Sequence, residues 1–127
     1  MAFGQRTLLM LDGTFAVCRL GSTAPIPAWA TGGFFSITRT TEELSIVCCQ
    51  DSIPEDVHCE RGWRCLRVAG VFEFSVVGVL ASLVAPLAEA GISVFVVSTF
   101  DTDYLLVKDQ DLEAALDALR EEGHTVR

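Results

Sequence analysis

The stretch GISVFVVSTFDTDYLLV, residues 91–107, decides how the rest of the chain is interpreted. After the opening glycine, the β-branched and aromatic run from Ile92 to Ser98 is typical of a strand. Asp101 to Asp103 consists of turn-forming residues, and the apolar run from Tyr104 to Val107 follows it. The stretch therefore predicts a β-hairpin with an acidic tip rich in serine and threonine.

A helix is predicted before this hairpin. Ser75 is expected to cap it, it runs from Val76 to Ala90, and Gly91 is expected to end it in the left-handed conformation. Pro86 lacks an N–H group and is expected to bend the helix. Residues at helical spacing form its predicted core face: Val76, Leu80, Leu83, Val84 and Leu87.

A second helix is predicted after the hairpin, with Asp109 as its cap and Gly123 at its end. The alternating run from Trp63 to Ala69 indicates a strand, and His124 to Arg127 can form a last edge strand. Residues 62–127 thus have the order β-α-β-β-α-β. This is the ferredoxin-like split unit, in which two helices cover one face of an antiparallel sheet.

The first half of the chain repeats the hairpin pattern. Thr41 to Val47 aligns with Asp101 to Val107 at an offset of 60 residues, and each segment follows a glycine and an apolar strand. Gly21 to Thr31 is short and broken by prolines, so it leaves no room for a full first helix. We therefore expect an α+β fold of tandem ferredoxin-like units, with a degenerate copy over residues 1–61 and a complete one over residues 62–127.

The first half also contains local signals for its other elements. Asp12-Gly13 is a strong signal for a hairpin turn between the first two strands. Residues 50–61 have the composition of a linker, and a helical turn can follow Pro54. Strand-like runs are found at residues 7–11, 15–20, 34–38 and 44–49.

The composition excludes several classes of protein. The 127 residues are 50% hydrophobic and 20% charged, which is enough apolar material to bury a core. The net charge is −8 and the nine Lys and Arg residues are scattered, so phosphate backbones and anionic membranes would repel the chain. No secretion signal or apolar run of about twenty residues is present. We expect a cytosolic protein that binds neither nucleic acid nor membrane.

The five cysteines and two histidines form no recognisable chemical motif. An odd number of cysteines at irregular spacing argues against a disulfide framework, and no pair has the spacing of a metal site. His58 and His124 belong to no evident nucleophile–base set, and no phosphate-binding or dinucleotide fingerprint occurs. We therefore expect no catalytic activity, no metal and no cofactor. A small enzyme that uses Cys59 or Cys65 stays open as an alternative.

Residues 71–94 resemble the ACT domain family, with a strand, a Gly-Val-Leu helix entry and Ala-Gly-Ile-Ser at the start of the next strand. The segment Ser-Thr-x-Asp-Thr-Asp, residues 98–103, is more specific. It is similar to the ACT modules of aspartate kinases, of small bacterial proteins built from ACT domains alone, and of cytosolic arginine sensors. The resemblance covers residues 62–124 and, more loosely, residues 7–50.

This resemblance implies a regulatory module that binds an amino acid where two copies pair. The expected assembly is therefore a homodimer, and its expected partner is a metabolic enzyme. Ser93 stands where many ligand-binding ACT domains have Asn. The implied ligand contacts are Phe74, Ser75, Val76, Val77 and Gly78 at the helix entry, Ile92, Ser93 and Val94 in the facing strand, and Thr99, Asp101 and Asp103 at the hairpin tip.

The chemistry of a zwitterion suits these residues. The first amides of a helix and its positive dipole end attract a carboxylate, and Gly78 lets a ligand approach the backbone closely. The ammonium group requires acceptors, which Glu73, Asp101 and Asp103 can offer. The alternative is a module without a ligand, which uses the same pairing to assemble or to dock on a metabolic enzyme.

Overall fold

The computed structural model describes residues 5–70 and 78–127, which form two compact units. Unit 1 comprises Met1–Asp12 and Arg64–Arg127, and unit 2 comprises Gly13–Trp63. These bounds differ from the division expected after residue 61, because the first twelve residues group with the C-terminal part of the chain.

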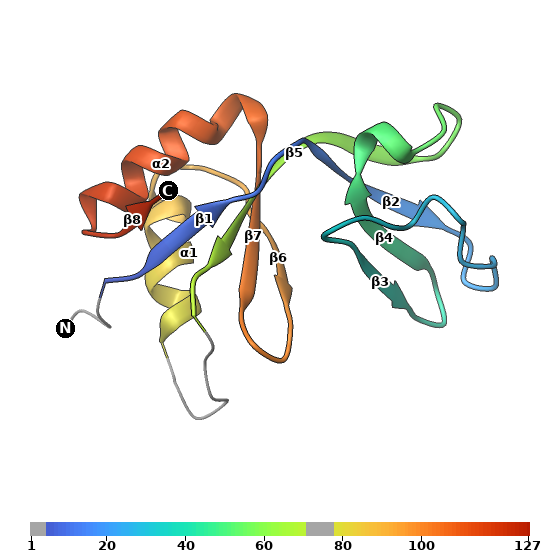
Figure 1. Ribbon diagram of the computed structural model, residues 1–127, viewed down its shortest axis with the longest axis horizontal. Coiled ribbons are helices and arrows are strands. Elements are labelled where there is room, and N and C mark those ends of the chain that lie inside the picture. The colour runs from blue at the N-terminus through green and yellow to red at the C-terminus, as the bar shows by residue number, and fades with distance from the viewer. Residues whose placement is uncertain (1–4, 71–77) are drawn as a thin grey trace. The chain divides into compact units, whose positions relative to one another are not determined.

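Unit 1 has five strands in the order β6-β7-β5-β1-β8. Within its β-α-β-β-α-β segment, the first strand is β5 and the last is β8, and β1 lies between them. Leu8 of β1 pairs antiparallel with Val68 and parallel with Val126. Figure 1 shows β1 between β8 and β5. The elements of this unit are β1 (Thr7–Met10), β5 (Cys59–Val68, its second half in unit 1), α1 (Val79–Glu89), β6 (Phe95–Ser98), β7 (Asp103–Lys108), α2 (Leu112–Glu121) and β8 (Thr125–Val126).

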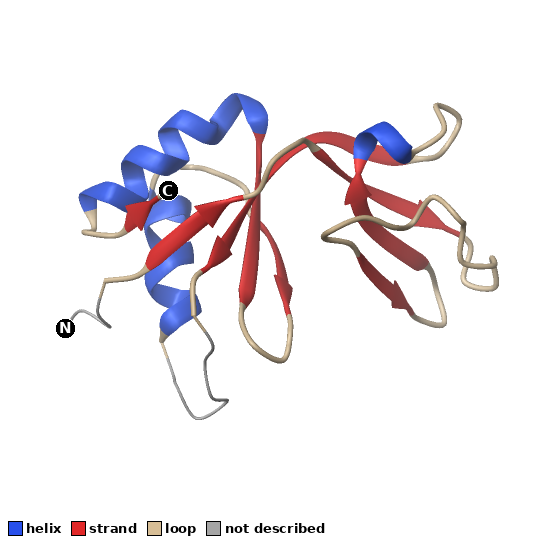
Figure 2. Ribbon diagram, in the orientation of Figure 1, coloured by secondary structure: helices blue, strands red, loops and turns tan. Residues whose placement is uncertain are grey.

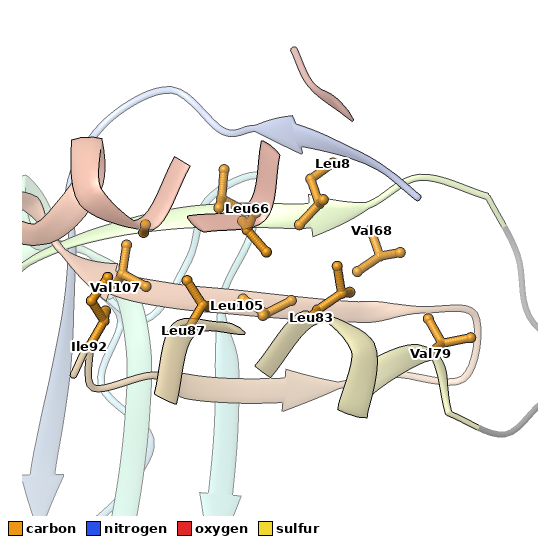
Figure 3. Packing of buried hydrophobic residues seen from close by; sticks show 11 residues of the cluster. Leu8, Leu66, Val68, Val79, Leu83, Leu87, Ile92, Leu105 and Val107 are labelled. Carbon is orange, nitrogen blue, oxygen red and sulfur yellow. The ribbon is translucent and has the colours of Figure 1, made fainter. Parts of the chain in front are cut away.

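The core of unit 1 lies between its sheet and the two helices, which pack against each other (Figure 2). Figure 3 shows Leu83 and Leu87 of α1 beside Leu105 of β7, with Leu66 of the neighbouring β5 close by. The buried side chains are Leu8, Leu66, Val68, Val79, Leu83, Leu87, Ile92, Leu105, Val107, Ala115 and Leu119. Of the core face predicted for the first helix, Leu83 and Leu87 are buried and Val84 packs against the cluster. Leu80 is only half-buried, and Val79 is buried in the core instead, while Val76 lies outside the described residues.

Both helices end at the predicted glycines. Gly91 follows α1 with a φ of +75°, and the amide of Ile92 donates to the carbonyl of Leu87 at 2.9 Å. The same pattern of bonds ends α2 at Gly123, whose φ is +91°. Glycine adopts this left-handed conformation without a Cβ clash, so each helix stops at a defined residue.

The start of α1 differs from the prediction. The helix begins at Val79, and Gly78, with a φ of +83°, is its N-cap residue. A residue with positive φ cannot belong to a right-handed helix, so the expected helix over Val76–Ala90 is corrected to this shorter one. Ser75, the predicted cap, lies outside the described residues.

Two other bounds are shorter than predicted. A 3₁₀ turn over Asp109–Asp111 precedes α2, so Asp111 rather than Asp109 holds the N-cap position. Strand β6 begins at Phe95 rather than Ile92. The amide of Ile92 is bonded to the end of α1, which delays the start of the strand.

His124 replaces a hydrogen bond that Pro86 removes from α1. Pro86 has no N–H group for the carbonyl of Ser82, four residues earlier. The Nε2 atom of His124 lies 3.2 Å from that oxygen, and its Nδ1 atom lies 3.0 Å from the backbone nitrogen of Arg6. The amide of Arg6 can only donate, so Nδ1 is the acceptor and Nε2 carries the proton. The buried imidazole therefore connects α1 to the residue that precedes β1.

Unit 2 is built from strands in the order β3-β4-β2-β5 and contains no α-helix over residues 13–63, all of which the structure describes. The predicted hairpin is present as β3 and β4, and the Thr40 hydroxyl accepts hydrogen bonds from the amides of Glu42 and Glu43 in its turn. The elements are β2 (Phe15–Leu20), β3 (Ser36–Arg39), β4 (Leu44–Cys49), the 3₁₀ turn η1 (Gln50–Ser52) and the first half of β5.

Asp12-Gly13 does not form the predicted hairpin turn. Within the described residues, β1 and β2 do not pair with each other, because each pairs antiparallel with β5. Leu8 is opposite Val68 near the end of β5, and Cys18 is opposite Cys59 at its beginning. The long-range partner strand overrides the local turn signal.

We predict that Pro86 and His124 are energetically coupled. His124→Ala leaves the Ser82 carbonyl without its donor, at a cost of about 2–3 kcal/mol. In a Pro86→Ala background, the amide of Ala at position 86 can bond to the carbonyl of Ser82. The loss of unfolding free energy caused by His124→Ala should therefore be about 1 kcal/mol smaller in this background. Urea unfolding of the four proteins measures this coupling energy.

A cycle between His124→Ala and Glu89→Ala, an exposed position on the same helix, serves as the control. It should be additive within about 0.5 kcal/mol. Additivity in the Pro86 cycle as well would contradict the proposed replacement of the helix bond.

Candidate functional site

The predicted ligand-binding residues fall at the helix entry, in the segment before β6 and at the tip of the β6–β7 hairpin. The part of the site formed by Glu73, Phe74, Ser75, Val76 and Val77 lies outside the described residues. The geometry of the candidate site therefore rests on the remaining groups.

Gly78 marks the start of α1. Its carbonyl accepts the amide of Ser82 at 3.0 Å, which closes the first turn of the helix. The amides of Val79 and the next two residues precede that bond, and a helix offers them no backbone acceptor. The first turn also contains no acidic side chain. The helix start thus has the donors and the dipole sign that suit a carboxylate.

The segment Ile92, Ser93 and Val94 divides its side chains between the core and solvent. Ile92 is buried in the core cluster, and Val94 packs against the same cluster. Ser93 is exposed. Of the three residues expected to contact a ligand, Ser93 is therefore the one whose side chain is not committed to the core.

Hydrogen bonds within the hairpin tip fix its polar side chains. The Thr99 hydroxyl donates to the Thr102 carbonyl at 3.0 Å and accepts the Thr102 amide at 3.2 Å. The Ser98 hydroxyl donates to Oδ1 of Asp103 at 2.6 Å, while Asp101 is exposed. Because Ser98 bonds to Oδ1, the second oxygen of Asp103 has its lone pairs for a further donor.

Thr102 anchors this tip to the sheet and was not among the predicted site residues. Its side chain is buried, and its hydroxyl donates to the carbonyl of Val68 at 2.7 Å. Val68 is the last residue of β5, and Val79 opens α1 at the same end of the sheet (Figure 3). The bond therefore brings the acidic tip to the end of the sheet at which α1 begins.

Cys65 and His124 are held in structural roles. Burial raises the pKa of Cys65 to about 12, so its thiol is protonated near neutral pH. Both ring nitrogens of His124 form the hydrogen bonds described above.

Over residues 5–70 and 78–127, no group of His, Cys, Asp and Glu side chains is arranged to hold a metal ion. In the same part of the chain, neither helix is long and apolar enough to cross a lipid bilayer.

Two solved structures are similar to this chain over almost its full length. A crystal structure from Agobacterium tumefaciens is 47% identical, with a TM-score of 0.93, and the match covers 98% of this chain and 93% of that one. The ligand-free regulatory subunit of aspartate kinase from Thermus thermophilus is 12% identical, with a TM-score of 0.62 and coverage of 87% and 93%. The second match shows similarity of fold alone.

Among curated proteins, the human cytosolic arginine sensor for mTORC1 subunit 1 is 33% identical over 100 residues. The match covers 70% of this chain and 30% of the sensor, so the chain spans about a third of the length of such relatives. A model of an N-terminal domain matches residues 13–56. The model of the ACT domain matches residues 58–121, which is half of the chain, and we conclude that the chain belongs to the ACT domain family.

Proposed function

We propose that this chain is a regulatory module that binds a free amino acid at the start of α1 and catalyses no reaction. The observation that carries the proposal is the bond of 2.7 Å from Thr102 to Val68, which holds an acidic hairpin tip at the end of the sheet where α1 begins. Membership of the ACT family supports a regulatory role. The human relative is an arginine sensor by name.

Each end of the ligand has a matching group in this proposal. The carboxylate binds the first amides of α1, where Gly78 has no side chain to obstruct it, and residues 74–77 are the remaining proposed contacts. The ammonium binds Asp101 and the second oxygen of Asp103, together with Glu73. Charge-assisted bonds of about 1.5–3 kcal/mol each give micromolar to millimolar affinity after association costs.

The proposed assembly is a homodimer through β6. In the described residues, β6 is an edge strand of unit 1 and pairs with β7 alone. An exposed edge can add a strand from a second copy, which extends the sheet. In this proposal the dimer acts in the cytosol on a metabolic enzyme, and ligand binding favours one arrangement of the copies over another.

The same edge also supports the alternative, an assembly module that docks on a metabolic enzyme without a ligand. An enzyme based on Cys65 is disfavoured, because burial raises the pKa of that thiol to about 12. Ligand binding is therefore the property that separates the two functions.

A thermal-shift screen tests the proposed function directly. Each of the twenty common amino acids is added at about 5 mM to the full chain, and one at about ten times its Kd should raise the melting temperature by about 5 °C. Absence of a shift with every amino acid would leave the assembly module as the function.

Asp103→Asn tests the ammonium contact for whichever amino acid gives that shift. The substitution keeps an acceptor for Ser98 but removes the charge, so affinity measured by calorimetry should fall about tenfold. Asp117→Asn, an exposed position on α2, is the matched control and should leave the affinity unchanged. Equal losses in both variants would indicate a general charge effect instead of a contact.

Thr102→Val tests whether the anchored tip belongs to the site. The variant removes the donor to Val68 while it keeps the side-chain volume. The free energy of unfolding should therefore fall by about 1–3 kcal/mol. Amino-acid binding should weaken at a temperature where the variant is still folded. Thr102→Ser retains the hydroxyl and should restore most of both properties. Full binding by the valine variant would argue against a role of the tip.

A further inference from the structure

Unit 2 places two cysteines directly opposite each other on neighbouring strands. Cys18 of β2 pairs with Cys59 of β5 in the antiparallel ladder. The amide of Arg19 donates to the carbonyl of His58 at 3.0 Å, so the adjacent position, Cys18 with Cys59, is a non-hydrogen-bonded pair. The Cα atoms of such pairs are about 4.5 Å apart, which lies within the range that a disulfide requires.

The two thiols interact in the reduced protein. Cys59 packs against the core cluster to which Cys18 belongs. Burial, followed by the neighbouring Cys59 and Cys48, raises the pKa of Cys18 to about 12. The pair is therefore in contact, with Cys18 in the protonated form.

No other cysteine occupies an equivalent position. Cys48 is opposite Ala16 on β2, which makes it a diagonal neighbour of Cys18 at about 7–8 Å, beyond the usual disulfide range. Cys49 follows Cys48 and points to the other face of its strand. Cys65 belongs to unit 1.

The exposure of the two thiols differs. Cys18 is 1% exposed and belongs to the core cluster of unit 2. Cys59 is half-buried, at the first position of β5, and packs against the edge of that cluster. An oxidant in solution would therefore reach Cys59 first, with Cys18 already beside it.

We propose that Cys18 and Cys59 are a reversible thiol–disulfide pair that a peroxide oxidises. The proposal does not depend on amino-acid binding, because it concerns unit 2 alone. The loop that the disulfide would close contains 40 residues, from 19 to 58, including β3 and β4. Closing it would fix β2 to the start of β5 and restrict the unfolded chain.

The chemistry has two steps. The sulfur of Cys59 attacks one oxygen of hydrogen peroxide, the O–O bond breaks, and Cys59 becomes a sulfenic acid with release of one water. The sulfur of Cys18 then attacks that of Cys59, the S–O bond breaks, and hydroxide leaves as water with the proton of Cys18. Two thiols and one peroxide thus give one disulfide and two waters, and a dithiol reductant reverses the oxidation.

The test treats the reduced full chain with hydrogen peroxide and then alkylates the remaining thiols under denaturing conditions. Mass spectrometry should show loss of two hydrogens and three alkylated cysteines out of five. Trypsin should then link residues 7–19 to residues 40–61. The second peptide contains three cysteines, so variants must identify the partner.

Cys18→Ala and Cys59→Ala should each abolish the link, and alanine is small and apolar enough to keep the fold. Cys49→Ala, in the same tryptic peptide and also half-buried, is the matched control and should retain it. The oxidised wild type should melt at least about 5 °C higher than the reduced one, and dithiothreitol should reverse the shift. A link through Cys48 or Cys49 would overturn the proposal, and so would oxidation of Cys59 that proceeds to a sulfinic acid without any link.

Discussion

The ladder of β5 is the constraint on which the rest of the structure depends. Cys59–Trp63 pairs with β2 in unit 2, and the second half of the strand pairs with β1 and β7 in unit 1. Between the halves, the register against β2 shifts at Phe15 and Val17, and Gly62 has a φ of +83°. An irregularity of this kind interrupts the ladder locally, and the ten residues of β5 contribute to the cores of both units.

Local sequence signals predict most individual elements of this fold. The bounds of β4, Leu44–Cys49, match the expected run, and Gly91 and Gly123 end their helices as expected. The ferredoxin-like arrangement of unit 1 is likewise confirmed, and it agrees with the match to the ACT domain. These features depend on periodicity and on backbone conformations that few residues adopt, which a single sequence records directly.

The features that the sequence does not predict depend on partners distant in the chain. Asp12-Gly13 has the chemistry of a tight turn, but β1 gains more from a place between β5 and β8. Within the candidate site, apolar residues such as Ile92 and Val94 are compatible with a position beside a ligand or in the core. In this fold, Ile92 belongs to the core cluster and Val94 packs against it. Thr102 resembles one more turn residue between two aspartates until its bond to Val68 is known. Pairing and burial of this kind are global properties.

The position of β1 has a consequence for how the chain acquires its structure during synthesis. Thr7 pairs with Thr125, so the sheet of unit 1 joins segments that are far apart in the sequence and leave the ribosome at different times. Unit 2, in contrast, is a contiguous segment nested between the two pieces of unit 1. Because domains fold as units when they emerge, we expect unit 2 to assemble first, while the apolar strand Thr7–Met10 waits for its second neighbour. Because pairing between distant segments slows folding, we expect the closure of unit 1 to be the slow step.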